Sequence, residues 1–221
     1  QATSNKQQAT SNKQQATTNS VSFTFIKPPM KLTKKHWSNI IFVVIIALII
    51  FTPIGTFVKV KLNQAKMLFF SPDSIELTER VAISDFHWNL VDGSGKTVNF
   101  KEMEGDIILV NFWATWCPPC VAEMPSLDKL YADYKDKITF VFVANDKIKN
   151  VNAYLKKSGY DFPVYYSKDN EPVELRSPSI PTTYLIDDQG NIVMKEVGSS
   201  NWNSTNVRNQ IDELLAFSLA E

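Results

Sequence analysis

Hydrophobic and polar positions divide the chain into regions of different character. Residues 1–20 repeat the polar heptad QATSNKQ, and such a tract cannot bury enough apolar surface to offset the entropy lost on ordering. We therefore expect residues 1–38, which comprise this tract and a basic tail, to be disordered. Short apolar runs separated by polar turns begin near residue 81 and continue toward the end of the chain, a pattern typical of a folded domain.

A long apolar run, Ile40–Val58, contains nineteen residues without a charge and is flanked by lysines. As a helix it would extend about 28 Å, close to the thickness of the hydrocarbon core of a bilayer. We expect a single uncleaved transmembrane helix over residues 39–58. A cleavable signal peptide is the alternative, because Pro53 and Gly55 shorten the most apolar part of the run.

The chain after this run is long enough for one compact domain with its own core. We expect a connector over residues 59–80, irregular from residue 62, and the domain over residues 81–221. The apolar runs predict a hairpin with strands Phe86–Leu90 and Thr97–Phe100, then a buried strand Ile107–Trp113 and a helix to about Tyr134. A strand Ile138–Val143, a helix Val151–Lys157, a segment Phe162–Tyr166 and strands Thr182–Asp187 and Ile192–Val197 are expected to follow. The last element is a helix with one apolar face, formed by Val207, Ile211, Leu214 and Leu215, and with Asn203 or Ser204 as its cap. This alternation predicts an α/β fold with helices on both faces of a central mixed sheet.

The formal net charge of zero conceals a strong asymmetry along the chain. Residues 1–66 hold nine lysines and no acidic residue, whereas residues 67–221 hold the other 14 basic residues and all 23 acidic ones. The folded domain is therefore acidic, and we expect no nucleic acid among its partners.

Both cysteines lie in the sequence Trp116-Cys117-Pro118-Pro119-Cys120, directly after the expected buried strand. Because the chain has no further cysteine, a framework of structural disulfides is excluded. A structural zinc site would need two more ligands. His36 and His87 are the only histidines, and zinc is disfavoured because His36 lies in a different region of the chain from the cysteines. Haem attachment needs a histidine where Val121 stands, and a passive disulfide across so short a loop stabilises little. We therefore expect thiol–disulfide exchange, with no metal and no cofactor other than the redox-active Cys117–Cys120 disulfide.

The two prolines between the cysteines indicate which sulfur attacks. Proline suits the first turn of a helix, because the amide hydrogens there have no acceptor within the helix. Cys117 would then lie at a helix N-terminus, whose partial positive charge favours the thiolate and lowers its pKa by one or two units from about 8.5. We expect Cys117 to be the nucleophile and Cys120, one turn deeper, to resolve the mixed disulfide.

Three segments of the domain stand out together: NFWATWCPPC over Asn111–Cys120, EMP over Glu123–Pro125, and IPTTYLID over Ile180–Asp187. With these segments the chain from about Ile83 onward resembles the thioredoxin superfamily and, within it, the extracytoplasmic TlpA/ResA-like thiol-disulfide oxidoreductases. The resemblance implies a thioredoxin-like fold with an added N-terminal β-hairpin. It also implies a cis peptide bond before Pro181, with its loop against the disulfide, and substrate binding by Trp116, Ile180, Pro181 and Thr182.

Glu123 is the third candidate catalytic residue. It follows Cys120 by three positions, so both lie on the same face of the helix, where a carboxylate can carry a proton to or from a buried thiol. As an ordinary helix residue it would be solvated, but the resemblance implies a functional role. Asn111 stands where cytosolic thioredoxins have a buried aspartate, and an amide cannot take a proton, which leaves this task to Glu123 or to water.

The expected function is that of a membrane-tethered oxidoreductase that reduces disulfides of exported proteins, of which apocytochrome c is the first that the resemblance suggests. Partners would be protein disulfides, the membrane through residues 40–58, and an upstream membrane thiol donor. We expect a single-pass protein of the cell membrane with its C-terminal domain on the extracytoplasmic (periplasmic) side, where disulfide exchange takes place. The alternatives are an extracytoplasmic thiol oxidant or isomerase, and a non-catalytic thioredoxin-like binding module.

Overall fold

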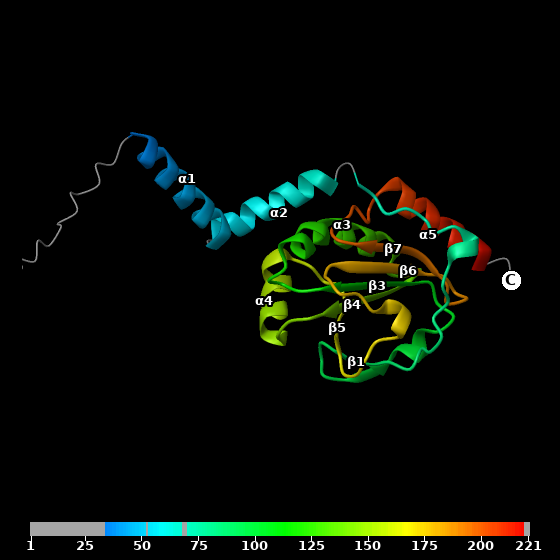
Figure 1. Ribbon diagram of the computed structural model, residues 1–221. Helices are drawn as coiled ribbons and strands as arrows, with labels where there is room; N and C mark the ends of the chain where they lie inside the picture. The colour runs from blue at the N-terminus through cyan, green and yellow to red at the C-terminus, as the bar shows by residue number, and fades with distance from the viewer. Residues whose placement is uncertain (1–33, 52, 68–69, 219–221) are drawn as a thin grey trace, which may run out of the picture. The chain divides into compact units, whose positions relative to one another are not determined.

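The computed structural model describes residues 34–51, 53–67 and 70–218 (Figure 1). The disorder expected over residues 1–38 falls mostly outside the described residues, and residues 34–38 are helical. The chain divides into two units between Val43 and Val44, and the second unit contains the folded domain.

Two helices, α1 (Lys34–Phe51) and α2 (Pro53–Met67), occupy the region before the domain. Pro53 begins the second of them, a position where the missing N–H of proline costs the helix nothing. The apolar run expected to form an anchor is therefore shared between two helices. Within the described ranges, no helix combines the length and the apolar character that a membrane crossing requires. The anchor over residues 39–58 stays a prediction.

The region expected to be a connector proves to be more ordered than its composition indicates. Its first part continues α2 to Met67, and its last part runs along the outer strand β7 (Ile192–Val197) of the domain. There the N–H of Ile75 donates to the carbonyl of Val193 at 2.7 Å, and Ser74 forms an isolated antiparallel β-bridge with Met194. These bonds pair backbone groups that an edge strand would otherwise leave exposed. The domain therefore recruits residues that precede its expected start.

Seven strands form one mixed sheet in the order β2-β1-β5-β4-β3-β6-β7. Strands β3, β4 and β5 are parallel to one another, and the remaining pairs are antiparallel. The bounds of the other six strands are β1 Asn89–Asp92, β2 Thr97–Asn99, β3 Ile108–Trp113, β4 Thr139–Ala144, β5 Val164–Ser167 and β6 Thr182–Ile186. The predicted α/β fold with a mixed sheet and an added hairpin is confirmed.

The first strand of the hairpin begins three residues later than predicted, at Asn89. It ends at Asp92, whose carboxylate accepts hydrogen bonds from the backbone N–H of Ser94 at 2.8 Å and of Lys96 at 3.0 Å and so closes the turn. The apolar residues before it, Phe86 and Trp88, are buried against the sheet instead of extending the ladder. Burial of large side chains therefore outweighs strand pairing there.

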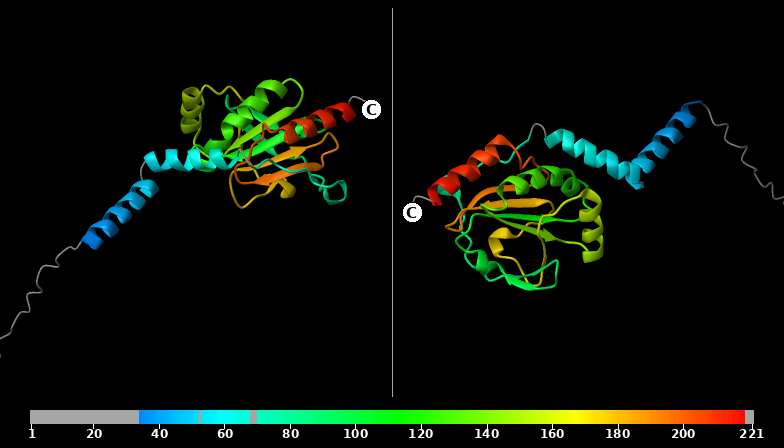
Figure 2. Two further views of the ribbon diagram at one scale, coloured as in Figure 1. Left: turned by 90° about the horizontal axis from the view of Figure 1, so that it is seen from above. Right: turned by 180° about the vertical axis from the view of Figure 1, so that it is seen from behind.

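Helices cover the two faces of the sheet unequally. The three helices α3 (Pro118–Tyr134), α4 (Ile148–Ser158) and α5 (Thr205–Ser218) all contribute buried side chains to one core, and Figures 1 and 2 show α3 and α5 over the same face. The opposite core is covered by the segment before β1 and by two short 3₁₀ helices, η2 (Phe100–Met103) and η3 (Val173–Leu175). The predicted mixed sheet flanked by helices is confirmed, and the unequal cover arises because the connections β3–α3–β4 and β4–α4–β5 advance across the sheet in one direction. Right-handed crossovers then place both helices on one face.

Strand β3 positions the cysteine pair. Its side chains alternate between the two cores, with Leu109 and Trp113 on the α3 side and Ile108 and Val110 on the other. The same alternation turns the polar side chain of Asn111, which is fully buried, toward α3. The segment with both cysteines follows the carboxyl end of this strand directly.

Candidate functional site

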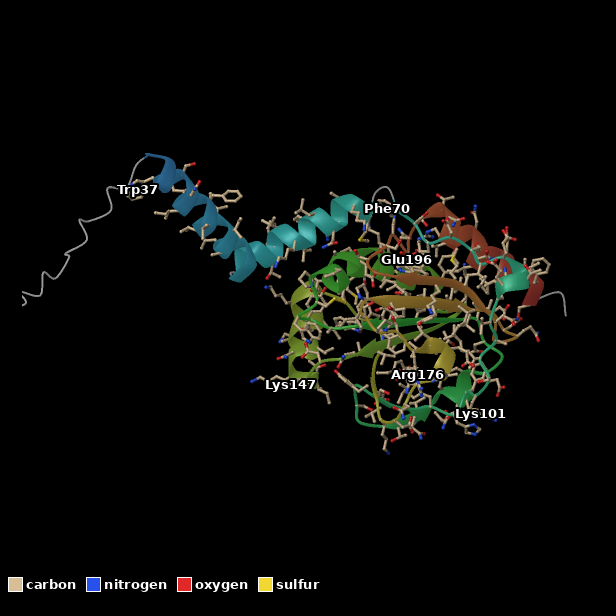
Figure 3. The ribbon with its side chains drawn as sticks, viewed as in Figure 1. Trp37, Phe70, Lys101, Lys147, Arg176 and Glu196 are labelled. Atoms are coloured by element: carbon tan, nitrogen blue, oxygen red, sulfur yellow. A yellow bond between two sulfur atoms is a disulfide. The ribbon has the colours of Figure 1, made fainter. Side chains whose placement is uncertain are left out.

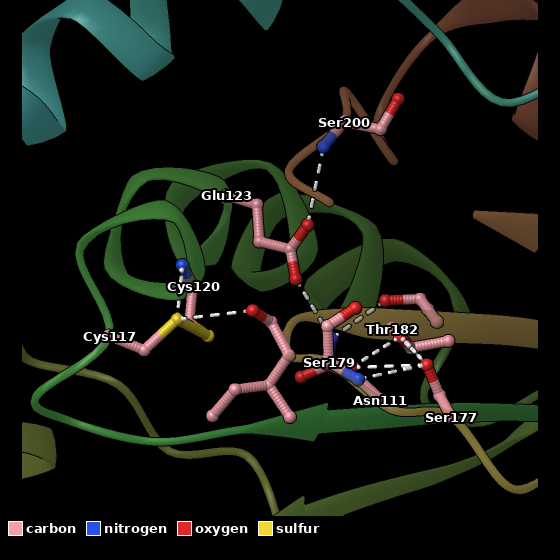
Figure 4. Close-up of a disulfide and its surroundings, with 10 residues drawn as sticks. Asn111, Cys117, Cys120, Glu123, Ser177, Ser179, Thr182 and Ser200 are labelled. Atoms are coloured by element: carbon pink, nitrogen blue, oxygen red, sulfur yellow. Dashed lines mark hydrogen bonds between the residues drawn. A yellow bond between two sulfur atoms is a disulfide. The ribbon is translucent and has the colours of Figure 1, made fainter. Parts of the chain in front are cut away.

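A disulfide joins Cys117 and Cys120 at the start of α3, with their Cα atoms 5.3 Å apart (Figure 4). Cys117 is the N-cap residue of the helix, and its sulfur accepts a hydrogen bond from the backbone N–H of Cys120 at 3.2 Å. Pro118 and Pro119 form the first turn. The predicted position of Cys117 at a helix N-terminus is confirmed, so the positive end of the helix faces its sulfur.

The two sulfur-bearing residues differ in access to solvent. Cys117 is 4% exposed, whereas Cys120 is completely buried. Of the two residues, only Cys117 therefore has any surface that an approaching protein can meet. This arrangement fits Cys117 as the attacking residue and Cys120 as the resolving one.

The loop before β6 lies against the disulfide. The Ile180–Pro181 peptide bond is cis, as predicted, and the carbonyl oxygen of Ile180 lies 3.7 Å from the Sγ atom of Cys117. Trp116, which directly precedes the cysteine in the chain, is 62% exposed. The structure thus brings the backbone of Ile180, the disulfide and an exposed aromatic ring into one surface region.

Thr182 lies beneath this loop and not on its surface. Its side chain is completely buried, and its hydroxyl donates to the carbonyl of Ser179 at 2.8 Å and lies 2.8 Å from the hydroxyl of Ser177 (Figure 4). Its backbone belongs to β6. Any contribution of this side chain to substrate binding would therefore come from the shape that it gives to the loop.

Glu123 is buried behind the disulfide on the next turn of α3. Its carboxylate accepts a hydrogen bond from the Asn111 side-chain amide at 2.9 Å and from the backbone N–H of Ser200 at 3.3 Å (Figure 4). The same amide nitrogen of Asn111 donates to the hydroxyl of Thr183 at 2.7 Å. Two separate parts of the chain therefore hold the carboxylate in the interior, and Thr183 of a third part holds the amide of Asn111.

Burial raises the pKa of Glu123 to about 8, the hydrogen bonds from Asn111 and Ser200 oppose this shift, and the charge of the nearby Glu196 adds to it. At neutral pH the protonated form therefore predominates. A carboxyl group whose pKa lies near neutrality can both donate and accept a proton under physiological conditions. Composition alone would favour a solvated side chain at this position, but the side chain of Glu123 is completely buried.

Two partners of the site were not found in the sequence. Ser200 reaches Glu123 through its backbone N–H, which every residue type except proline provides, so no residue pattern marks it. Asp146 accepts hydrogen bonds from the hydroxyl of Thr115, from the N–H of Lys147 at 2.6 Å and from the side chain of Asn150 at 2.9 Å. These bonds connect the loop before Cys117 to the start of α4. An aspartate just before a helix is a common capping signal, which could have identified this residue.

Residue types that bind metals are dispersed in the described part of the chain. Within residues 34–51, 53–67 and 70–218, no group of three or more His, Cys, Asp or Glu side chains is placed to hold a metal ion. His87 is exposed, and its ring contacts the carboxylate of Asp85 at 2.7 Å.

Comparison with known sequences identifies similar proteins over the folded domain. The Redoxin family profile matches residues 78–213. A thioredoxin-like protein, YneN of Bacillus subtilis, is 34% identical over 134 residues, which cover 59% of this chain and 78% of that protein. The thiol-disulfide oxidoreductase ResA of Halalkalibacterium halodurans is 32% identical over 133 residues, which cover 59% of this chain and 74% of that protein.

Comparison with solved structures gives the same picture. The crystal structure of a protein described as a putative thiol:disulfide interchange protein DsbE, from Chlorobium tepidum, matches with a TM-score of 0.52 at 26% sequence identity. The match covers 63% of this chain and 99% of that one. The solution structure of a putative thioredoxin from Neisseria meningitidis matches with a TM-score of 0.50 at 34% identity, over 61% of this chain and 91% of that one.

Proposed function

The chain belongs to the Redoxin family, as a TlpA/ResA-like member of the thioredoxin superfamily, and from this premise we propose that it reduces disulfides of exported proteins. It is a thiol-disulfide oxidoreductase with Cys117 and Cys120 as its redox pair. The observation that carries the proposal is the geometry at Cys117. Its sulfur lies at a helix N-terminus, in a residue that is 4% exposed, and beside the Ile180 carbonyl of a cis-proline loop.

The reaction begins with the dithiol form of the protein. The Cys117 thiolate attacks one sulfur of the substrate disulfide, a mixed disulfide forms, and the other substrate sulfur leaves as a thiolate. Cys120 then loses its proton and attacks the Cys117 sulfur, which releases the second substrate thiol and leaves the Cys117–Cys120 disulfide. Two electrons pass to the substrate, and an upstream membrane thiol donor returns two electrons to the protein.

We propose that Glu123, in the ionised form that is the minority at neutral pH, accepts the proton of Cys120. It lies one helical turn beyond this cysteine, is buried with it, and has a pKa raised to about 8 by burial. The negative charge that the carboxylate carries before it accepts the proton is met by the amide of Asn111 and the N–H of Ser200. Neither partner can itself take the proton, so the carboxyl group is the titrating member of this cluster.

The direction of the reaction is inferred from the residues between the cysteines. Pro118 and Pro119 provide neither a histidine nor a backbone N–H to stabilise the Cys117 thiolate. The sulfur of Cys117 accepts its hydrogen bond from the backbone N–H of Cys120. A weakly stabilised dithiol form makes the pair more reducing, which supports reduction over oxidation or isomerisation.

Location and substrate are the finer parts of the proposal. We place the domain on the extracytoplasmic side of the cell membrane, with a single-pass anchor at residues 40–58, because this run of nineteen residues carries no charge and the thiol chemistry belongs outside the cytoplasm. The resemblance to cytochrome-maturation reductases makes apocytochrome c the first substrate to test.

A trapping experiment in cells tests this function. In a Cys120→Ser variant the mixed disulfide at Cys117 cannot be resolved, so substrates should stay covalently attached and be identified by mass spectrometry after non-reducing electrophoresis. The matched control is a Cys117→Ser, Cys120→Ser variant, which should trap nothing. Adducts with exported disulfide proteins would support the proposal. Equal recovery from the trap and the control would contradict it and favour a non-catalytic binding module.

A further inference from the structure

A hollow lies beside the disulfide at the carboxyl ends of the parallel strands β3, β4 and β5. Its volume is about 660 Å³, and its lining includes Ile180, whose carbonyl contacts the Cys117 sulfur. The hollow and the reacting sulfur therefore meet at one residue. Clefts at the carboxyl ends of parallel strands are common ligand sites in α/β proteins, and this volume is typical of such sites.

The floor of the hollow is apolar. Phe112 and Val143 contribute from two neighbouring strands, and Leu175 contributes from η3. All three belong to or pack against the core on the face opposite α3. An aliphatic chain can lie on such a floor and exclude water from it.

Two carboxylates border the hollow, from Asp146 and from Glu171. Asp146 is ionised at neutral pH, because the Thr115 hydroxyl and other donors lower its pKa. Glu171 has no hydrogen bond or ion pair among the described residues, and its charge adds to the burial that raises the pKa of Tyr184 to about 12. Lys147 also borders the hollow, but its side chain is exposed and forms no ion pair with either acid in the described part of the chain. The carboxylate of Glu171 is therefore the unpaired negative charge of the hollow among the described residues, and it lies above an apolar floor.

We propose that this hollow is a specificity subsite for a lysine or arginine side chain of the substrate polypeptide, close in sequence to the cysteine that Cys117 attacks. A long basic side chain matches both features, because its methylene groups can cover the apolar floor while its charged end meets the two carboxylates. The inference rests on the proposed function and adds a substrate class to it. Polypeptides with a basic residue beside the reacting cysteine react faster than those without one.

Peptides that differ in one side chain test the subsite. Each contains a single cysteine, joined in a mixed disulfide to a small chromophoric thiol, and either lysine or norleucine two residues to either side. Cys117 attacks the peptide sulfur and releases the chromophoric thiolate, and Cys120 then releases the peptide thiol, so the reduced chain turns over once per peptide. We expect the second-order rate constant of this single turnover to be roughly three- to tenfold higher for the lysine peptide at low salt and the ratio to fall as salt is added.

Two variants of the full chain locate the effect. Glu171→Gln should reduce the ratio between the lysine and norleucine peptides toward one. Glu213→Gln removes the same charge from an exposed position on α5, over the other face of the sheet, and should leave the ratio unchanged. Equal rates for both peptides with the unmodified chain, or an unchanged ratio in Glu171→Gln, would overturn the subsite.

A binding measurement separates failure of the subsite from failure of the proposed function. Peptides with serine in place of cysteine cannot exchange, so their binding is read from amide shifts at Tyr166 and Ser167, which line the hollow. Larger shifts with lysine than with norleucine support the subsite even if no peptide is reduced, in which case the proposed function fails alone. Equal or absent shifts overturn the subsite even if both peptides are reduced.

Discussion

Asn111 on β3 and Glu123 on α3 share a hydrogen bond of 2.9 Å in the interior behind the disulfide, and both side chains are completely buried. Asn111 offers a donor and no titrating group, so the proton of this pair belongs to Glu123. The pair therefore keeps one ionisable carboxyl group behind the resolving cysteine. Its protonation couples the stability of the fold to pH.

Replacing Glu123 with glutamine should remove a pH dependence of stability. The pKa of Glu123 is raised from 4.5 to about 8 in the fold, so the folded state retains a proton that the unfolded state loses as pH rises between these values. The free energy of unfolding should therefore be highest below about pH 4.5 and fall by on the order of 4 kcal/mol up to about pH 8. In Glu123→Gln this part of the decline should be absent. Urea unfolding across this pH range measures it.

The control for this prediction is Glu213→Gln, which replaces an exposed glutamate on α5. It should follow the same pH profile as the unmodified protein. If Glu123→Gln also follows that profile, the carboxyl group does not carry a raised pKa and the proposed proton transfer loses its basis.

The bond between Thr115 and Asp146 should hold the loop before Cys117. The carboxylate of Asp146 accepts from the Thr115 hydroxyl and from the start of α4, so Thr115→Val and Asp146→Asn should each destabilise the protein. A double-mutant cycle should give a coupling of about 1 kcal/mol, since the pair lies close to solvent. Because the Thr115 bond is the largest cause of the lowered pKa of Asp146, the coupling should be present above about pH 4 and be lost below it. Additive effects of the two substitutions would show that the bond contributes nothing.

Replacing Thr182 with valine should loosen the cis-proline loop. The change keeps the shape of the buried side chain but removes the hydroxyl that bonds Ser179 and contacts Ser177. We expect a loss of about 1 kcal/mol in the free energy of unfolding and a higher KM for peptide disulfides, because the Ile180 carbonyl is less firmly placed. Ser177→Ala is the matched control and should have the smaller effect on KM, since it leaves the bond from Thr182 to Ser179 intact. Unchanged KM in Thr182→Val would separate this side chain from substrate binding.

Local patterns predicted the parts of the site that are close together in the chain. Cys117, the two prolines and Cys120 form a strand-to-helix junction, and the spacing of Glu123 from Cys120 placed both on one helix face. The cis bond before Pro181 was expected from the family resemblance. Contacts between distant segments were not visible in this way. Ser200 meets Glu123 through a backbone N–H across 77 residues, and Thr115 meets Asp146 across 31.

The same limit applies to the fold. Apolar runs identified most strands and helices, and Ser204 proved to be the cap of α5, where its hydroxyl accepts from the N–H of Val207 at 3.3 Å. The face on which each helix lies depends on strand order and crossover direction, which no run of residues encodes. The start of β1 was misplaced because Phe86 and Trp88 look like strand residues but are buried against the sheet.

The most direct measurement of the central claim is the site of alkylation in the reduced protein. A limiting amount of iodoacetamide is added at neutral pH, and peptide mass spectrometry gives the modification at each cysteine. The account predicts modification of Cys117 at least about tenfold faster than that of Cys120, because Cys117 is slightly exposed at a helix N-terminus that favours its thiolate and Cys120 is completely buried. Equal modification of the two cysteines, or faster modification of Cys120, would contradict the assignment of Cys117 as the attacking sulfur.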